Sequence, residues 1–185
     1  MKNIPFEIVR AQADDAAALL EYLKIIGGET DNLSFGPEGV PLDAENERSY
    51  LAMQAQSDEN IQLLAKVNGE IIGTASLNRK QKRMSHRAVF GISLKKAWWG
   101  CGAATVLAEG VLDFARKAAR LEEAGVRSLS LEERVSNDAA RALYEKLGFR
   151  KLCTFPGFFK INGELIDFDL MNLELVPTAK NSETL

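Results

Sequence analysis

The chain has 185 residues, 46% of them apolar and 26% charged, with 23 Lys and Arg against 26 Asp and Glu. This composition predicts one folded domain, and a formal net charge of −3 argues against a partner held by many phosphates, so nucleic acid is not expected. Two Cys and one His are too few for a disulfide framework or a zinc site of these residue types, so no metal is expected.

Signals for secretion or membrane insertion are not evident in the sequence. The start of the chain lacks the apolar stretch of a signal peptide, and no run approaches the ~18 apolar residues that a membrane span needs. The scarcity of cysteine favours a reducing compartment. We therefore expect a soluble, cytoplasmic protein with no membrane partner.

The N-terminal third of the chain predicts a strand and two helices. An apolar run at residues 6–9 predicts the strand, and Asp14 is placed to cap a first helix that Gly27-Gly28 should end. Residues 29–41 are rich in Gly, Pro, Asn, Asp and Ser and predict a long loop of the kind that is usually functional or mobile. A second helix is expected over residues 43–56, with Asp at its N-cap.

The middle of the chain predicts antiparallel strands followed by a long helix. Strands at 61–67 and 70–77 flank Asn68-Gly69, which is a strong hairpin signal. After a basic turn that we interpret as a solvated hairpin tip, residues 88–94 predict a third strand. A glycine-containing turn then leads into a helix over 103–119 with a broad apolar face.

The C-terminal part predicts a strand at 128–133, a helix over 137–147 that Gly148 ends, and strands at 149–155 and 165–175 joined by a turn near Asn162-Gly163. This order of elements predicts an α/β protein with a mixed, mostly antiparallel sheet and helices on its faces.

We expect residues 1–175 to form a single domain. Residues 176–185 are expected to be a flexible C-terminal tail.

One segment, residues 92–104, predicts an anion site. A strand there ends in Gly100-Cys101-Gly102 directly before a helix, where unpaired backbone N–H groups and the positive end of the helix dipole attract phosphate. The alternative is that the glycines only turn the chain. The third glycine of a dinucleotide fingerprint is missing and no P-loop occurs, so dehydrogenase, kinase and NTPase chemistry are unsupported.

A second segment, residues 137–149, predicts a helix with a chemically useful surface. Helical spacing places Asn137, Arg141 and Tyr144 near one another on the surface. The core-facing positions are then expected to be Ala140, Leu143 and Leu147. Taken alone, Tyr144 is either a half-buried packing residue or a catalyst.

Several short motifs follow one another along the chain: Val9-Arg10-Ala11, Gly69-Glu70-Ile71-Ile72-Gly73, Gly91-Ile92-Ser93-Leu94, Gly100-Cys101-Gly102 and Asn137-x-x-Ala140-x-x-x-Tyr144-x-x-x-Gly148-Phe149. Together they resemble the GCN5-related N-acetyltransferase (GNAT) superfamily over most of the chain, although Ala97 stands where the family usually has Arg or Gln. The resemblance implies a seven-stranded, twisted, mostly antiparallel sheet with helices on both faces, in which the fourth and fifth strands splay apart.

The resemblance also implies an acyltransferase that moves an acetyl group from acetyl-CoA, its co-substrate, to a primary amine of a small molecule or protein by direct attack. It implies two catalytic groups, the Leu94 N–H facing the thioester carbonyl and the Tyr144 phenol protonating the departing thiolate. The expected contacts with acetyl-CoA are Ile92, Ser93, Leu94, Trp99, Gly100, Cys101, Gly102, Ala103, Ala104, Asn137 and Tyr144.

The general base stays open, because Val89-Phe90 occupy the stretch where many relatives carry a Glu. The remaining candidates are Glu132, Glu133, His86 and Glu29, and a relay of water molecules is the alternative. Two rival functions also stay open: a non-catalytic acyl-CoA-binding or sensor domain, and a structural domain without CoA. A homodimer is left open as well.

The acceptor amine is the least defined part of the prediction. An acidic stretch would suit a cationic amine, or its carboxylates only mark a helix start; they are Glu29, Asp31, Glu38, Asp43, Glu45 and Glu47. Four aromatic residues either line the acceptor pocket or belong to the core: Phe35, Tyr50, Phe158 and Phe159.

Overall fold

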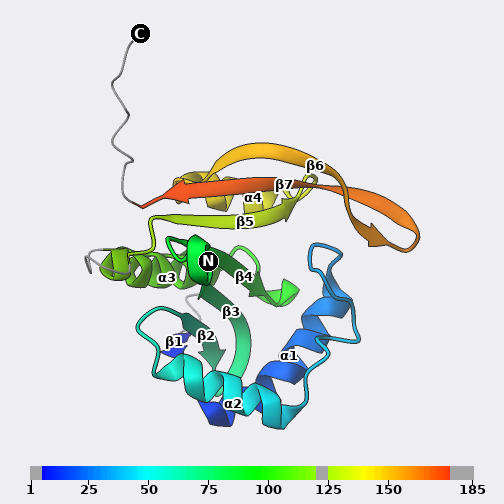
Figure 1. Ribbon diagram of the computed structural model, residues 1–185. Helices are drawn as coiled ribbons and strands as arrows, with labels where there is room; N and C mark the ends of the chain where they lie inside the picture. Colours follow the sequence, from blue (N-terminus) through cyan, green and yellow to red (C-terminus); the bar gives the residue numbers. More distant parts are fainter. Residues whose placement is uncertain (1–5, 120–124, 176–185) are drawn as a thin grey trace.

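A seven-stranded sheet in the order β1-β2-β3-β4-β5-β7-β6 organises the chain (Figure 1). The computed structural model describes residues 6–119 and 125–175, so the expected tail lies outside the described residues. The strands are Glu7–Arg10 (β1), Ile61–Val67 (β2), Glu70–Arg79 (β3), Arg87–Leu94 (β4), Ser128–Arg134 (β5), Arg150–Ile161 (β6) and Glu164–Glu174 (β7). The helices are Ala16–Glu29 (α1), Ala44–Ala55 (α2), Ala103–Ala119 (α3) and Asp138–Lys146 (α4).

The sheet is mixed, as the sequence predicts. Neighbouring strands run antiparallel except for β4 and β5, which pair in parallel. Two tight hairpins hold the register, and in each the Asn-Gly pair adopts left-handed backbone angles, with φ of 50° and 82° at Asn68-Gly69 and of 51° and 89° at Asn162-Gly163. Both predicted turns are therefore confirmed.

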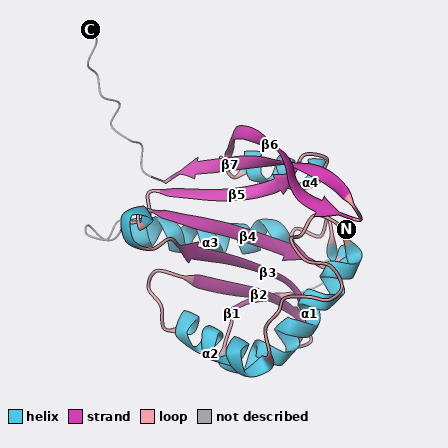
Figure 2. Ribbon diagram, turned by 45° about the vertical axis from the view of Figure 1, so that its right-hand side comes forward, coloured by secondary structure: helices cyan, strands magenta, loops and turns pink. Residues whose placement is uncertain are grey.

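Helices cover both faces of the sheet, which confirms the layered architecture (Figure 2). The smaller cluster of buried residues joins α1 and α2 to the sheet; its members are Ala11, Ala16, Leu19, Tyr22, Ile26, Leu51, Leu64 and Ile71. The larger cluster lies under α3 and α4 and includes Leu77, Phe90, Leu107, Val111, Leu129, Tyr144 and Phe149.

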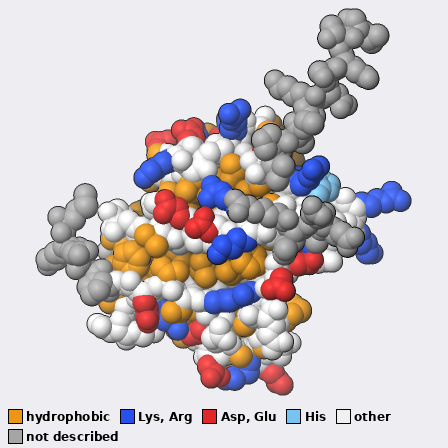
Figure 3. Space-filling model, turned by 90° about the vertical axis from the view of Figure 1, so that its left-hand side faces the viewer, with side chains coloured by type: hydrophobic (Ala, Val, Ile, Leu, Met, Phe, Trp, Pro, Cys, Tyr) orange, Lys and Arg blue, Asp and Glu red, His pale blue; other side chains and the backbone are white. Residues whose placement is uncertain are grey.

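Hydrophobic side chains also reach the surface. On the side that carries the C-terminal end of α3, they form a band across the middle of the molecule, with charged side chains above and below it (Figure 3). No helix in residues 6–119 and 125–175 combines the length and the apolar character that crossing a bilayer requires.

The predicted end of the first helix at Gly27-Gly28 is wrong, because α1 continues to Glu29. The reason is packing between segments that are distant in sequence. A Cβ on Gly27 would lie 1.9 Å from the backbone oxygen of Gly36, so the loop after the helix presses directly against the helix backbone. Gly27 is thus required for close approach rather than for helix termination.

Gly27→Ala should lower the free energy of unfolding by about 1–3 kcal/mol, the usual cost of forcing extra atoms into a packed site. Gly28→Ala is the matched control, because its Cβ would meet only Pro37 Cβ at 3.6 Å. That control should be neutral or stabilising by up to ~1 kcal/mol through the higher helix propensity of Ala. Urea unfolding of both variants measures the difference; equal stabilities would contradict the packing argument.

Candidate active site

Strands β4 and β5 separate after a short paired stretch. They pair at Arg87–Ser128, Ala88–Leu129 and Val89–Ser130, and no pairing between them continues beyond that point. Strand β4 stays paired with β3 up to Leu94, and β5 stays paired with β7 up to Arg134. The sheet therefore opens between the C-terminal halves of β4 and β5, which confirms the predicted splay.

The open edge of β4 carries unpaired backbone groups at defined residues. The Lys95 N–H donates to the Ile72 carbonyl at 2.9 Å, and in an antiparallel ladder alternate residues direct their N–H and C=O to opposite sides. Since Lys95 faces β3, the polar groups of Leu94 and Ile92 point toward β5. Ile92 and Leu94 are among the contacts with acetyl-CoA that the family resemblance implies.

The glycine turn and the start of α3 follow directly after this open edge. Gly100 and Gly102 have φ of 75° and 92°, and a Cβ on either would meet nothing within 4 Å. The Val106 N–H bonds to the Gly102 carbonyl at 3.2 Å, so the N–H groups of Ala103 and Ala104 lack acceptors inside the helix. An open backbone surface with free donors at a helix N-terminus is suited to a phosphate group.

Trp99 lies at the edge of the same opening, in a way the sequence did not predict. Its indole Nε1 donates to the Leu94 carbonyl at 2.9 Å, and its side chain is half exposed. The Lys96 ammonium lies 6.0 Å from the centre of the indole ring. The Leu94 carbonyl is thus hydrogen-bonded to the indole, while the Leu94 N–H stays free. The side chain of Cys101, in the turn itself, is exposed.

The predicted orientation of α4 is wrong in one important respect. Tyr144 does not project from the surface but is 8% exposed, with its ring centre 6.3 Å from Phe90 and 6.0 Å from Phe149. Ala140 and Leu147 pack only partly against the same core. A stripe through 140, 144 and 147 satisfies helical spacing as well as one through 140, 143 and 147, so spacing alone did not decide the phase.

The Tyr144 phenol stays protonated in this buried position. Burial, and after it the charge of Glu133, raises the pKa of Tyr144 well above the usual value of a phenol. The hydroxyl forms no hydrogen bond with any residue that the structure describes. A phenol that stays protonated and makes no such bond keeps its O–H free to donate.

The comparisons with known proteins bear on this arrangement. The model of the Acetyltransferase (GNAT) family matches residues 30–149 of the chain. The chain belongs to the GNAT family. This confirms the resemblance drawn from the sequence. The protein is therefore an N-acetyltransferase, an enzyme that uses acetyl-CoA.

Solved structures of GNAT proteins share the fold. A GNAT acetyltransferase from Streptococcus pneumoniae has a TM-score of 0.84 and 30% identity, over 92% of this chain and 99% of that one. The structure of yncA from Salmonella typhimurium, determined with its cofactor acetyl-CoA, has a TM-score of 0.78 and 22% identity, over 94% and 96%. A ribosomal-protein-alanine N-acetyltransferase from Brucella melitensis has a TM-score of 0.76 and 22% identity, over 91% of this chain and 99% of that one. A search of curated proteins found no match.

In this GNAT enzyme, Arg141 ties α4 to the strands instead of facing solvent beside Asn137. Its guanidinium donates to Glu133 at 3.0 Å, to Asp169 at 3.1 Å and to the Val135 carbonyl at 2.7 Å. Glu133 and Asp169 are almost fully buried. The network therefore fixes the helix that carries Tyr144 against β5 and β7.

The two carboxylates of this network respond differently to burial. Burial raises the pKa of Glu133 despite its bond to Arg141. Burial alone would also raise the pKa of Asp169, but bonds from Lys151 and Thr154 and the charges of Lys151 and Arg141 lower it below its usual range. Asp169 is thus the anion on which the network depends. Glu133 is held on the α4 side of the sheet by its hydrogen bond from Arg141.

The four candidate bases lie in different places. His86 precedes β4 at the closed end of the sheet, where its carbonyl accepts from Arg127 N–H at 2.7 Å, and Glu133 faces Arg141. Glu132 is exposed on β5. The Glu29 carboxylate accepts from the backbone N–H of Lys96 at 2.7 Å and so lies at the C-terminal end of β4. Only Glu132 and Glu29 are left at the open end.

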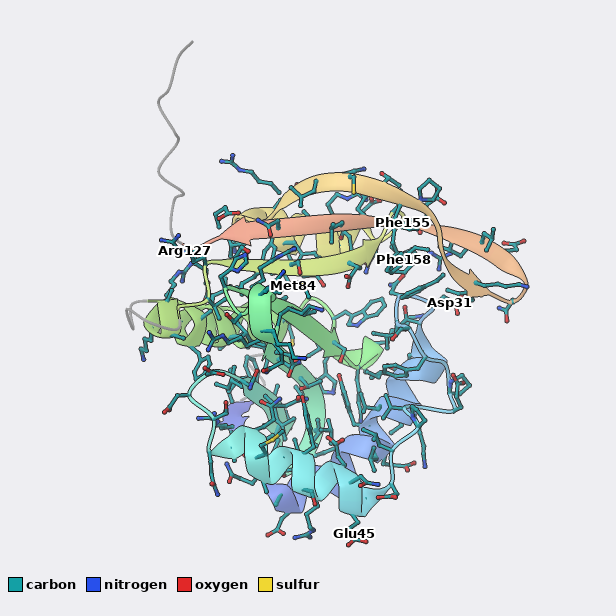
Figure 4. All side chains as sticks on the ribbon, viewed as in Figure 1. Asp31, Glu45, Met84, Arg127, Phe155 and Phe158 are labelled. Carbon is teal, nitrogen blue, oxygen red and sulfur yellow. The ribbon has the colours of Figure 1, made fainter. Side chains whose placement is uncertain are left out.

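The acidic stretch considered for the acceptor is dispersed. Asp43 caps α2 through the Asn46 N–H at 2.8 Å, Glu47 is buried, and Glu38 accepts from the Gly36 N–H at 2.8 Å. Figure 4 shows Glu45 on the outer side of α2, far from Asp31. These carboxylates do not form one binding surface, and most have local structural roles.

The four aromatic candidates also divide. Phe35 and Tyr50 pack against the smaller core, and the Tyr50 hydroxyl donates to Asn78 at 2.8 Å. Phe158 stacks on Phe159 at 5.1 Å between ring centres, and both contact the buried Phe168. Phe158 remains 38% exposed, so it alone of this group presents a large accessible apolar side chain.

Asp169→Asn should lower the free energy of unfolding at pH 7 by about 2–3 kcal/mol, somewhat less than for a fully buried ion pair because Arg141 and Lys151 are partly exposed. A lowered pKa in the folded state gives stability above the unfolded value, ~3.9, that is lost as the pH falls. The wild type should therefore lose more stability than the variant below about pH 4.

Urea unfolding at pH 7 and in acid measures both effects. The matched control is Asp113→Asn, which removes an exposed pair with Arg116 at 3.3 Å and should cost less than ~0.5 kcal/mol. Similar losses in the two variants would show that the network does not hold α4.

Proposed function

We propose that this enzyme transfers the acetyl group of acetyl-CoA to a primary amine of a small molecule or protein by direct attack of the amine. The observation that carries the proposal is the continuity of three features along one edge: the unpaired backbone of Ile92 with the Leu94 N–H, the open glycine turn and the free N–H groups of α3. The acetyl-CoA in the Salmonella typhimurium yncA structure supports it.

The residues divide the work of binding acetyl-CoA along this edge. The backbone of Ile92 offers a ladder position to an amide of the pantetheine arm, and the Leu94 N–H is left for the thioester carbonyl. The turn of Gly100, Cys101 and Gly102 and the following Ala103 and Ala104 offer N–H groups to the pyrophosphate, whereas the Trp99 N–H already donates to the Lys96 carbonyl at 3.2 Å. These contacts use backbone groups, so the contact at Cys101 does not depend on its side chain.

Ser93 and Asn137 have narrower roles. The Ser93 hydroxyl lies 3.0 Å from the Tyr22 hydroxyl of α1, on the face opposite α3, and the Ser93 backbone groups face β3 like those of Lys95, so Ser93 offers acetyl-CoA no free hydrogen-bonding group. The Asn137 side-chain oxygen caps α4 by accepting from Ala140 N–H at 3.4 Å. Its amide N–H group is still free to bond the pantetheine arm.

The Leu94 N–H is assigned to the oxyanion. When an amine attacks the thioester, negative charge develops on the carbonyl oxygen, and a fixed donor aimed at that oxygen is worth ~3 kcal/mol. Because Leu94 belongs to a strand held by β3, its N–H does not need to reorganise during the reaction.

Tyr144 is assigned to the leaving thiolate. A thiol has a pKa of ~8.5 and an unperturbed phenol one of ~10, so complete proton transfer costs at least about 2 kcal/mol, and the raised pKa of Tyr144 increases this cost. The phenol therefore acts mainly as a hydrogen-bond donor while charge grows on sulfur and gives up its proton late.

CoA should raise the melting temperature of the protein, and Gly102→Glu should abolish this rise, because a carboxylate in the turn would repel the pyrophosphate. Gly69→Glu is the matched control. Gly69 has a similar φ of 82° and open space around its Cβ position, but it lies in the β2–β3 hairpin. A CoA-induced shift that survives in Gly102→Glu would remove the turn from the binding site.

Tyr144→Phe should keep CoA affinity but lower kcat by about ten- to a thousand-fold, within or just below the range of general acid catalysis. The ring contacts to Phe90 and Phe149 are retained, so the melting temperature should change little. Thiol release from acetyl-CoA with the best amine of a panel measures turnover. A wild-type kcat, or loss of CoA binding together with turnover, would end the acid assignment.

A further inference from the structure

Direct attack requires a neutral amine, and the structure suggests where the proton of an ammonium acceptor goes. Glu29, the last residue of α1, is tethered to the reacting end of β4. Its Oε2 accepts from the Lys96 N–H at 2.7 Å, two residues beyond Leu94. Two residues of extended chain span roughly 7 Å, so the carboxylate lies close to the proposed thioester position.

Glu29 approaches β4 from the face opposite α3. On the same helix, the Tyr22 hydroxyl reaches the Ser93 hydroxyl at 3.0 Å, which places the side of α1 facing the strand beside the end of β4. Burial above all, and also the charge of Glu29, raises the pKa of Tyr22. An acceptor that enters on the α1 face would meet the Glu29 carboxylate before the acetyl carbon.

The other charged groups on the elements that meet here do not replace Glu29. The Lys95 ammonium pairs with Glu70 at 2.6 Å, and Asp31 lies 4.0 Å from Arg134 of β5. The remaining rival, Glu132, is exposed, and its side chain makes no hydrogen bond or ion pair with a residue that the structure describes. Glu132 is therefore not held in position as Glu29 is by the Lys96 N–H.

We propose that Glu29 is the general base of the transfer, an assignment that rests on the proposed function. Its Oε2 is held by Lys96, and Oε1 takes a proton from the ammonium group of an aliphatic amine. The substrate class is therefore an amine that is protonated at neutral pH.

The step balances in atoms and charge. The amine lone pair forms the N–C bond, and the C–S bond breaks with its electron pair on sulfur, which takes the Tyr144 proton. The second N–H proton leaves to water as the amide forms. Glu29 then releases its proton to solvent and the Tyr144 phenolate regains one, so one proton is released for each amide formed.

The test compares Glu29→Gln with Glu29→Ala. Glutamine keeps an oxygen that can accept from the Lys96 N–H but cannot take a proton, whereas alanine loses both functions. With the polyamine, aminoglycoside or free-N-terminus peptide that the wild type acetylates best, both variants should lose 10²–10⁴-fold in kcat/KM near pH 7. The loss should shrink as the pH rises toward the pKa of the amine, and the CoA-induced rise in melting temperature should persist.

Each other outcome has a defined meaning. If Glu29→Gln matches the wild type while Glu29→Ala is impaired, Glu29 only holds Lys96 and the proposal is wrong. A comparable loss in Glu132→Gln with an unaffected Glu29→Gln would move the role to Glu132. Glu21→Gln, at an exposed α1 carboxylate 3.6 Å from Lys24, controls for loss of charge and should be unchanged. A wild type that acetylates no amine overturns the proposed function as well.

Discussion

The end of the β4–β5 ladder after Val89 and Ser130 is the constraint on which the rest of the site depends. Backbone N–H and C=O groups are almost always paired, and leaving one buried without a partner costs about 1–3 kcal/mol. An opening inside a sheet is therefore tolerated only where water or a ligand can satisfy the exposed groups. The same opening leads to the glycine turn at the start of α3.

The opening persists because each strand that borders it is paired with another strand on its other side. Strand β4 keeps its full register with β3, and β5 keeps its register with β7 up to Arg134. Arg141 then joins α4 to both β5 and β7 through Glu133 and Asp169. The two halves of the sheet are thus separately braced, and the packing of Phe90 of β4 against Tyr144 and Phe149 joins them on the α4 side.

Local signals allowed much of this to be predicted from sequence. Asn68-Gly69 fixes a hairpin by its turn geometry, and Asp43 and Asn137 cap α2 and α4 with their own side chains. Features decided by distant residues were not predictable. The helical state of Gly27 depends on the loop at Gly36, the bond from Lys96 to Glu29 joins residues 67 apart, and the phase of α4 depends on Phe90. The family signature predicts the cofactor side of the site, while the acceptor side carries no comparable local signal.

The indole of Trp99 has a consequence for the enzyme before it meets acetyl-CoA. Unpaired strand edges are templates on which other chains add, and proteins protect them with bulky or charged groups. At the Leu94 carbonyl, the Trp99 N–H bond fills one acceptor of such an edge with a side chain from the same polypeptide. Before acetyl-CoA binds, the Trp99 side chain thus protects the open part of the sheet against the addition of a strand from another molecule, and therefore against aggregation.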